Sequence, residues 1–388
     1  MDNLKEFFSI DPGIIFLNHG SFGASPKPVF STYQSWQARL EKQPVLFLGR
    51  ELDGLLFIAR EKLGEYLHAS PNDLVFIPNA THGVNIIARS LNLAQGDVIL
   101  TTDHEYGACE YAWEFVCNQA GVEFRRQKIS LPLVSDEQIV EEFWQGVDER
   151  TRIIYLSMIT SPTAIRLPIE EICARAKEFG ITTVIDAAHA PGQINMDLEK
   201  LNADIVFGNC HKWMLCPKGA AFLFVRNELQ NSIKPLVVSW GSHPTTETTT
   251  GSRFIDNLQW TGTRDPAASL SVPAAIEFMG EHHWDEVRIK CHDILRIAIS
   301  NICDLVQMEP LYSLDSKYFS QMGIAPIPIS DLIKLKSELY DQYKVEVPFI
   351  QWNGRQFVRI SVQGYNSIDD LEVLIKGLSE LLPKVGKE

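Results

Sequence analysis

Several features that mark particular protein classes are missing from this 388-residue sequence. Its seven cysteines form no Cys-x-x-Cys pair and no two histidines have a zinc-ligand spacing, so we expect neither a disulfide framework nor a metal site. Apolar runs such as residues 220–225 are too short to span a bilayer. Lysine and arginine total 35 against 49 acidic residues, a net charge of −14, which argues against nucleic-acid or anionic-membrane partners.

The composition that remains is typical of a globular protein. Apolar residues make up 45% of the chain and charged residues 22%, which excludes disordered and collagen-like classes. At roughly 150 residues per domain, this length predicts two or three domains. The first residues carry charges of both signs and no apolar stretch follows them, so we expect a cytoplasmic protein whose cysteines are small core residues.

Short β-branched segments alternate with amphipathic helical patterns through the first two-thirds of the chain. This alternation predicts an α/β fold with a mostly parallel sheet covered on both faces, in which one of the last two strands runs antiparallel. The expected strands lie at residues 73–77, 97–102, 122–127, 152–157, 182–186, 204–208 and 220–225. The expected helices between them lie at residues 83–91, 110–120, 136–146 and 169–179.

The pattern changes after about residue 270. A helical region at 271–305 is followed by a helix near 331–343, strands at 345–348 and 356–362, and a last helix from 369. We therefore expect a large domain at 26–270 and a smaller α+β domain at 271–388, with residues 1–25 packing on the smaller one. The polar stretch 245–251 predicts a mobile loop.

Three strand ends carry chemically suggestive residues, and ligands in open α/β sheets bind at that edge. The turn 78–83 begins a helix whose free N–H groups suit a phosphate, although an ordinary N-cap has the same composition. Asp186 ends an apolar strand and needs a cationic partner or a metal, unless it only caps a helix. Lys212 stands beside Trp213 and Met214, where desolvation lowers the pKa of an amine unless the chain reaches water.

The order of these three features is more informative than any one of them. A phosphate turn, a strand-end aspartate and a strand-end lysine are the anchors that pyridoxal 5'-phosphate requires. Other cofactor and enzyme classes lack their signatures. The sequence has no Gly-x-Gly-x-x-Gly after a strand, no Walker A motif and no Gly-x-Ser-x-Gly elbow.

With these residues in place, the sequence resembles the class V aminotransferase family of fold type I pyridoxal-phosphate enzymes, and most closely its isopenicillin N epimerase-like branch. The likeness runs from residues 16–23 to residues 358–366. Its most specific block combines Asp-Ala-Ala-His-Ala-Pro-Gly at 186–192 with His-Lys-Trp at 211–213 and Pro-Lys-Gly at 217–219. The resemblance implies a large cofactor-binding domain, a smaller C-terminal domain and a homodimer with shared active sites.

The resemblance also implies roles for individual residues. Lys212 would form the Schiff base and Asp186 would pair with the pyridinium nitrogen. Tyr106 takes the place of the family's ring-stacking histidine, since the segment Glu105–Trp113 aligns without gaps on the family's Glu-His…Pro-Trp. The other cofactor contacts implied in this way are His189, Ala80, Thr81, His82, Ser161, Asn209, His211 and, donated to the neighbouring subunit, Thr263.

Arg359 matches the arginine that grips the substrate α-carboxylate, and His19 is a further candidate for substrate contact. Two positions depart from the family pattern: Ser161 replaces a frequent asparagine, and Asn209 replaces a frequent serine. A third departure bears on the reaction. Cysteine desulfurases of this family carry a persulfide-forming cysteine shortly before the arginine, whereas no cysteine follows Cys303 here, which argues against that route.

The function implied is that of a pyridoxal-phosphate enzyme acting at the α-carbon of an amino-acid-type substrate through an aldimine and a quinonoid. The resemblance ranks an epimerase-like reaction first, in which Tyr106 or His19 is the second acid. A cysteine- or cystine-type C–S β-lyase and an aminotransferase are the alternatives. The alternative outside enzymology, a cofactor-binding sensor, is disfavoured by the intact Lys212 and the acidic charge balance.

Overall fold

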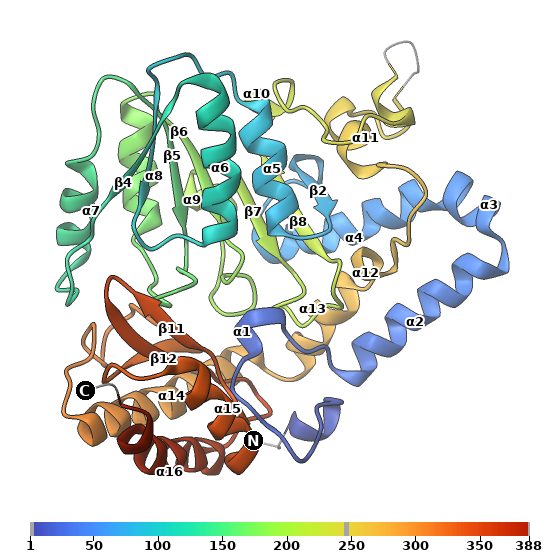
Figure 1. Ribbon diagram of the computed structural model, residues 1–388. Helices are drawn as coiled ribbons and strands as arrows, with labels where there is room; N and C mark the ends of the chain where they lie inside the picture. Colours follow the sequence, from blue (N-terminus) through green and yellow to red (C-terminus); the bar gives the residue numbers. More distant parts are fainter. Residues whose placement is uncertain (1–3, 244–247, 387–388) are drawn as a thin grey trace.

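The fold is described from a computed structural model, which covers residues 4–243 and 248–386 (Figure 1). Residues 245–247 of the loop expected at 245–251 lie outside the described part of the chain. Within the described ranges, none of the helices combines the length and the apolar character needed to cross a membrane.

A seven-stranded sheet forms the centre of the large domain. Its strands are β2 (Leu74–Ile77), β3 (Val98–Thr102), β4 (Glu123–Gln127), β5 (Thr151–Ser157), β6 (Thr182–Asp186), β7 (Ile205–Asn209) and β8 (Ala221–Val225). The spatial order is β2-β8-β7-β6-β5-β3-β4, and β8 runs antiparallel to both of its neighbours. All seven expected strands are confirmed to within one residue at each end, as is the single antiparallel strand.

Alternate strand residues are buried on opposite faces of this sheet. Leu74 and Phe76 join one apolar core, whereas Val75 and Ile77 join another. Helices α5 (Ala80–Ser90) and α6 (Gly107–Ala120) cover the second face, and α4 (Leu52–Leu67), α7 (Asp136–Trp144) and α8 (Ile169–Glu178) cover the first. Because both faces are covered, β2 and β8 are apolar throughout, whereas the edge strand β4 is mostly polar and partly exposed. The remaining helices of this region are α2 (Lys27–Lys42), α3 (Pro44–Leu46), α9 (Leu198–Leu201), α10 (Asn227–Gln230), α11 (Arg253–Gln259) and α12 (Ala267–Leu270).

The C-terminal part is built on a smaller antiparallel sheet with the order β11-β12-β9. Its elements are α13 (Val272–Glu281), α14 (Trp284–Val306), β9 (Met322–Ile327), α15 (Leu332–Tyr343), β10 (Val345–Glu346), β11 (Phe349–Trp352), β12 (Arg355–Ser361) and α16 (Ile368–Val385). The helical region expected at 271–305 is two helices, because His283 adopts a left-handed conformation (φ 49°) and interrupts the run.

The N-terminal segment joins the two parts. Strand β1 (Ile15–Phe16) pairs in parallel with β10, and the carbonyl of Leu17 accepts a hydrogen bond of 2.9 Å from the Ser361 N–H. Helix α1 (His19–Phe22) then lies between the small domain and the large one (Figure 1). The domain boundary at residues 270 and 271 stays a prediction.

Two glycines enclose the chain that follows β7. A Cβ on Gly23 (φ +70°) would lie 2.1 Å from the carbonyl oxygen of His211, and one on Gly192 (φ +87°) would lie 2.1 Å from that of Trp213. Such approaches are impossible for any residue with a side chain. These two turns therefore fix the backbone of residues 211–213 from both sides.

Replacing Gly192 by alanine tests this enclosure. We expect Gly192→Ala to lower the free energy of unfolding by about 2–4 kcal/mol in urea denaturation, because it adds both a steric overlap and a strained φ. Gly180→Ala is the matched control, since Gly180 has a similar φ of +66° but no atom within 4 Å of the added Cβ. Equal losses in the two variants would show that the Gly192 approach is not constrained by packing.

Candidate active site

A cavity of about 210 Å³ lies at the carboxyl ends of β5, β6 and β7, against the first turns of α5 and α6. Parallel strands end at a common edge, which is why residues distant in sequence meet here. Nine residues expected at the site line the cavity: Ala80, Thr81, Tyr106, Ser161, Asp186, His189, Asn209, His211 and Lys212.

Lys212 follows β7, and part of its side chain lines the cavity. Burial among protein atoms, and after it the charge of Arg359, lower the pKa of its amine to about 8 against the opposing influence of Asp186 and Cys109. Its Nζ lies 3.1 Å from Nε2 of His189. A lysine of this kind has a substantial fraction of neutral amine near neutral pH, which is the form that attacks carbonyl groups.

Asp186 is the last residue of β6 and its side chain is buried. Its Oδ1 accepts a hydrogen bond of 2.7 Å from the Ala188 N–H, and its Oδ2 accepts from Cys109 Sγ at 3.4 Å and Tyr155 Oη at 3.3 Å. Burial raises the pKa of the carboxyl, and these hydrogen bonds together with the charge of Lys212 oppose that rise. None of the three donors is a cation. The carboxylate therefore suits a positively charged ligand group in the cavity.

The first turn of α5 is partly satisfied from within the chain. The Ala80 N–H donates to Asn209 Oδ1 at 2.9 Å, and the His82 N–H donates to Asn79 Oδ1 at 2.8 Å. In the described structure this leaves the N–H of Thr81 to meet an anion, beside the Thr81 hydroxyl. Asn209 thus orients the turn from β7. The side chain of His82 does not line the cavity, and its role stays a prediction.

Arg359 comes from β12 of the small domain and is buried behind two residues that line the cavity, Ser161 and Ser21. Its Nη1 donates to Ser161 O at 2.5 Å and Ser161 Oγ at 3.2 Å, and its Nη2 donates to Ser21 Oγ at 3.4 Å. Its Nε has no hydrogen-bond partner among the described residues. Burial lowers the pKa of the guanidinium to about 10, so the group stays charged at neutral pH. A buried, incompletely satisfied guanidinium is suited to a carboxylate.

Four expected residues lie outside the cavity wall: His82 and Arg359, described above, together with His19 and Thr263. His19 is fully buried, and its ring nitrogens lie 2.9 Å from Tyr365 Oη and 3.0 Å from the carbonyl oxygen of Lys212. Burial lowers its pKa to about 3, so the ring stays neutral and supports the lysine backbone. Thr263 lies instead on a separate cavity of about 540 Å³ that Trp240 and Trp260 also line.

Sequence reasoning missed several residues of the cavity wall, among them Ser21, Phe22, Cys109 and Ser157. The spacing of residues along a helix or a strand could have predicted two of them, Cys109 and Ser157. Cys109 lies one helical turn after Tyr106, and Ser157 ends β5 directly opposite Asp186 in the parallel register. The two residues from α1 carried no such signal, because only the docking of the N-terminal segment brings them to the cavity.

Glu105 is a second buried carboxyl behind the cavity. Its Oε1 is 2.7 Å from Thr102 Oγ1, and its Oε2 is 2.5 Å from Ser157 Oγ and 3.0 Å from the Ser157 N–H. Burial is the main cause that raises the pKa of this carboxyl to about 8; the charge of Asp186 acts in the same sense, and the bonds from Ser157 and Thr102 oppose it. Glu105 is therefore mostly protonated at neutral pH and does not add a second negative charge near Asp186.

This raised pKa makes Glu105 a source of pH-dependent stability. Between the ordinary pKa of 4.5 and the folded pKa of about 8, the native state binds more protons than the unfolded state, so stability falls as pH rises. We expect Glu105→Gln to remove this fall. The difference in unfolding free energy between wild type and variant should decrease by roughly 2–4 kcal/mol from about pH 5 to pH 8.

The measurement is a series of urea denaturation curves across that pH range. Glu61→Gln, at an exposed glutamate, is the control and should leave the pH dependence unchanged. A wild-type profile that runs parallel to that of Glu105→Gln would mean that Glu105 is ionised in the folded protein.

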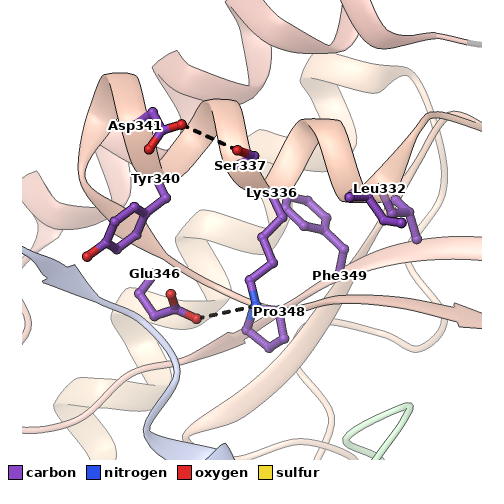
Figure 2. Close-up of a pocket in the computed structure, with 9 residues that line it drawn as sticks. Leu332, Lys336, Ser337, Tyr340, Asp341, Glu346, Pro348 and Phe349 are labelled. Atoms are coloured by element: carbon purple, nitrogen blue, oxygen red, sulfur yellow. Dashed lines mark hydrogen bonds and ion pairs between the residues drawn. The ribbon is translucent and has the colours of Figure 1, made fainter.

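The other hollows of the surface carry less chemistry. A groove of about 500 Å³ lies beside α15, and Lys336 pairs there with Glu346 at 3.7 Å. Figure 2 shows this pair together with Tyr340 and Phe349, which also line the groove. Its polar groups bind one another. Within the described ranges no group of histidine, cysteine or acidic side chains could hold a metal ion.

The mostly parallel sheet with one reversed strand, the small antiparallel domain and the buried strand-end lysine define a fold type I architecture. Residues 31–325 match the family model of Aminotransferase class-V. The chain belongs to that family and is an enzyme of it, as the sequence predicted.

Three similar proteins illustrate the range of the family. An isopenicillin N epimerase of Amycolatopsis lactamdurans is 33% identical, over 98% of this chain and 98% of its own length. A probable chloroplastic L-cysteine desulfhydrase of Arabidopsis thaliana is 26% identical, over 97% of this chain and 85% of its own. The structure of a cysteine desulfurase from Thermococcus onnurineus superposes with a TM-score of 0.81 at 17% identity, over 98% of both chains, and shares the fold.

Proposed function

We propose that this chain is a pyridoxal-phosphate enzyme that acts at the α-carbon of an amino-acid-type substrate, with an isopenicillin N epimerase-like reaction. The observation that carries the proposal is the meeting of Lys212, Asp186 and the Thr81 N–H in one cavity of about 210 Å³. The likeness to isopenicillin N epimerases over nearly the whole chain supports the epimerase-like form.

The residues present fit this cofactor. Lys212 offers a partly neutral amine for a carbonyl carbon, and Asp186 offers a buried carboxylate without a cationic partner among its hydrogen bonds. Thr81, with Asn209 and His211 nearby, would hold the phosphate, and the exposed ring of Tyr106 would cover one face. When bound, pyridoxal phosphate supplies an electron sink for the electron pair that remains when the α-carbon loses its proton.

The protein's part in the reaction is to hold the substrate and to move one proton. Arg359 would bind the substrate carboxylate through its free Nε and the weakly held Nη2. Lys212 Nζ, released by the incoming amine, would then accept the proton from the α-carbon. Enclosure of both groups in a buried site strengthens these charge interactions.

Epimerisation further needs an acid on the opposite face. Of the two expected candidates, Tyr106 lines the cavity, whereas both nitrogens of His19 are engaged elsewhere. Tyr106 is therefore the acid that we propose.

A C–S β-lyase is the second candidate, favoured by the likeness to L-cysteine desulfhydrases. Such a lyase needs a leaving group on the β-carbon and no protein thiol. The segment 345–355, where desulfurases carry their reactive cysteine, forms β10 and β11 and contains none.

A substrate panel in deuterated water tests the proposal. We expect α-carbon exchange and inversion without release of pyruvate, ammonia or sulfide, and Lys212→Ala should abolish turnover together with the visible absorbance of the lysine-bound cofactor. Lys200→Ala, at an exposed lysine, is the control. Release of pyruvate and sulfide would select the lyase, and a fully active Lys212→Ala would exclude the scheme.

We also propose a homodimer in which Thr263 reaches the partner's phosphate site. Thr263 lies far enough from its own Lys212 to line a different cavity, whose wall includes the exposed side chains of Val45 and Trp240 (76% and 79% exposed). Exposed apolar side chains gathered around a hollow mark protein–protein interfaces.

The seven free, buried cysteines support a reducing compartment such as the cytoplasm.

Hybrid dimers provide the decisive measurement. Thr263→Asp should abolish activity by repelling the phosphate, as should Lys212→Ala. When the two variants are co-expressed with different tags and the hybrid is purified, one site combines an intact Lys212 with an intact Thr263 from the partner. About half of the wild-type activity per dimer should return. No recovery would mean that Thr263 acts within its own chain.

A further inference from the structure

Two hydrogen bonds to one histidine determine where a proton lies beside Lys212. Nε1 of Trp213 lies 3.2 Å from Nδ1 of His189, and Nζ of Lys212 lies 3.1 Å from Nε2 of the same ring. An indole N–H can only donate. Nδ1 of His189 is therefore the acceptor and carries no proton.

The position of the remaining imidazole proton follows. A neutral imidazole carries one proton, and here it must be on Nε2, which faces Lys212. That N–H needs a lone pair, which a neutral amine has and an ammonium lacks. A protonated Lys212 would require the opposite tautomer, and two N–H groups would then meet between His189 and Trp213.

We infer that Trp213 is a positioning residue, which fixes the tautomer of His189 and through it favours Lys212 as the neutral amine. The statement about the tautomer stands on geometry alone. Its consequence for reactivity rests on the proposed function, in which the neutral amine of Lys212 attacks a carbonyl group.

Packing prevents the indole from turning away. Trp213 is fully buried, Gly192 closes on its carbonyl oxygen, and the ring of His19 lies 5.0 Å from the indole. Nε2 of His19 also lies 3.0 Å from the carbonyl oxygen of Lys212, where only an N–H can bond it. The backbone and the indole are thus held by separate contacts, and the hydrogen bond from Trp213 to His189 keeps its direction.

Charged groups around the amine of Lys212 also influence its protonation state, in addition to the tautomer of His189. Arg359 and burial favour neutral Lys212, whereas Asp186 and Cys109 favour the ammonium. His189 itself is held neutral, since burial first, then the charges of Lys212, Arg359 and His211, lower its pKa well below the ordinary value. These effects do not choose between the two nitrogens of the ring, and the Trp213 N–H does.

The tautomer can be measured directly in the cofactor-free full-length chain. With ¹⁵N-labelled histidine, the resonances of His189 are identified by their loss in His189→Gln. We expect a bare Nδ1 and a protonated Nε2 at pH 7. A proton on Nδ1, alone or together with one on Nε2, would overturn the inference without any change at Trp213.

Trp213→Phe tests the consequence, because it removes the N–H and keeps an aromatic ring. His189 can then carry its proton on Nδ1 and accept from the ammonium, so the pH midpoint for capture of pyridoxal phosphate by Lys212 should rise by about one unit or more. Trp113→Phe is the matched control, since Trp113 is equally buried and its indole N–H has no partner among the described residues. It should leave the midpoint unchanged.

An unchanged midpoint and an unchanged His189 spectrum in folded Trp213→Phe would refute the role of Trp213. If that variant does not fold, the wild-type spectrum still decides the tautomer. The two proposals fail separately. A chain with the expected tautomer that captures no pyridoxal phosphate would contradict the proposed function alone, whereas normal capture with the opposite tautomer would contradict only the inference about Trp213.

Discussion

The enclosure of Lys212 is the constraint on which the rest of the site depends. An amine surrounded by protein loses hydration, and this loss is the main cause of its lowered pKa. The enclosure has identifiable parts. Gly23 and Gly192 lack side chains and so pack directly against the backbone of residues 211–213 from two sides. The ring of His19 hydrogen-bonds the carbonyl oxygen of Lys212. A more open turn would hydrate the amine, and its pKa would return toward the ordinary value of a lysine.

The cavity is shared by three parts of the chain, so its geometry reports how they dock. Arg359 belongs to the small domain but hydrogen-bonds Ser161 of the large domain and Ser21 of the N-terminal segment. Away from the cavity, the Nε1–H of Trp352 donates to the carbonyl of Asp103 at 2.7 Å. That contact attaches the β11–β12 hairpin to the loop that leads into α6. A rigid movement of one domain against the other would therefore change the distance between Arg359 and Lys212 while leaving the structure within each domain unchanged.

Much of this arrangement was predictable because it depends on local pattern. The strands, the single reversed strand and the residues that follow β2, β6 and β7 were expected from apolar periodicity and from the rule that ligands meet at strand ends. What could not be predicted depends on contacts between distant segments. The nitrogens of His19 face Tyr365 and the backbone of Lys212, and Phe22 reaches the cavity only because β1 pairs with β10. No spacing rule encodes such docking. The roles expected for His82 and Thr263 stay predictions, since a ligand and a partner subunit would define them.

The net charge of −14 does not describe the region around the cavity, where acidic and basic groups lie together. Burial shifts one acid and one base near the cavity toward their neutral forms: Glu105 tends to keep its proton and Lys212 tends to lose its own. Arg359 stays charged, and at Asp186 burial raises the pKa while hydrogen bonds from Ala188, Cys109 and Tyr155 favour the carboxylate. A zwitterionic amino acid carries one charge of each sign, and a buried guanidinium and a buried carboxylate offer a counter-charge to both. The charges that burial leaves in place therefore fit the amino-acid-type substrate that we propose.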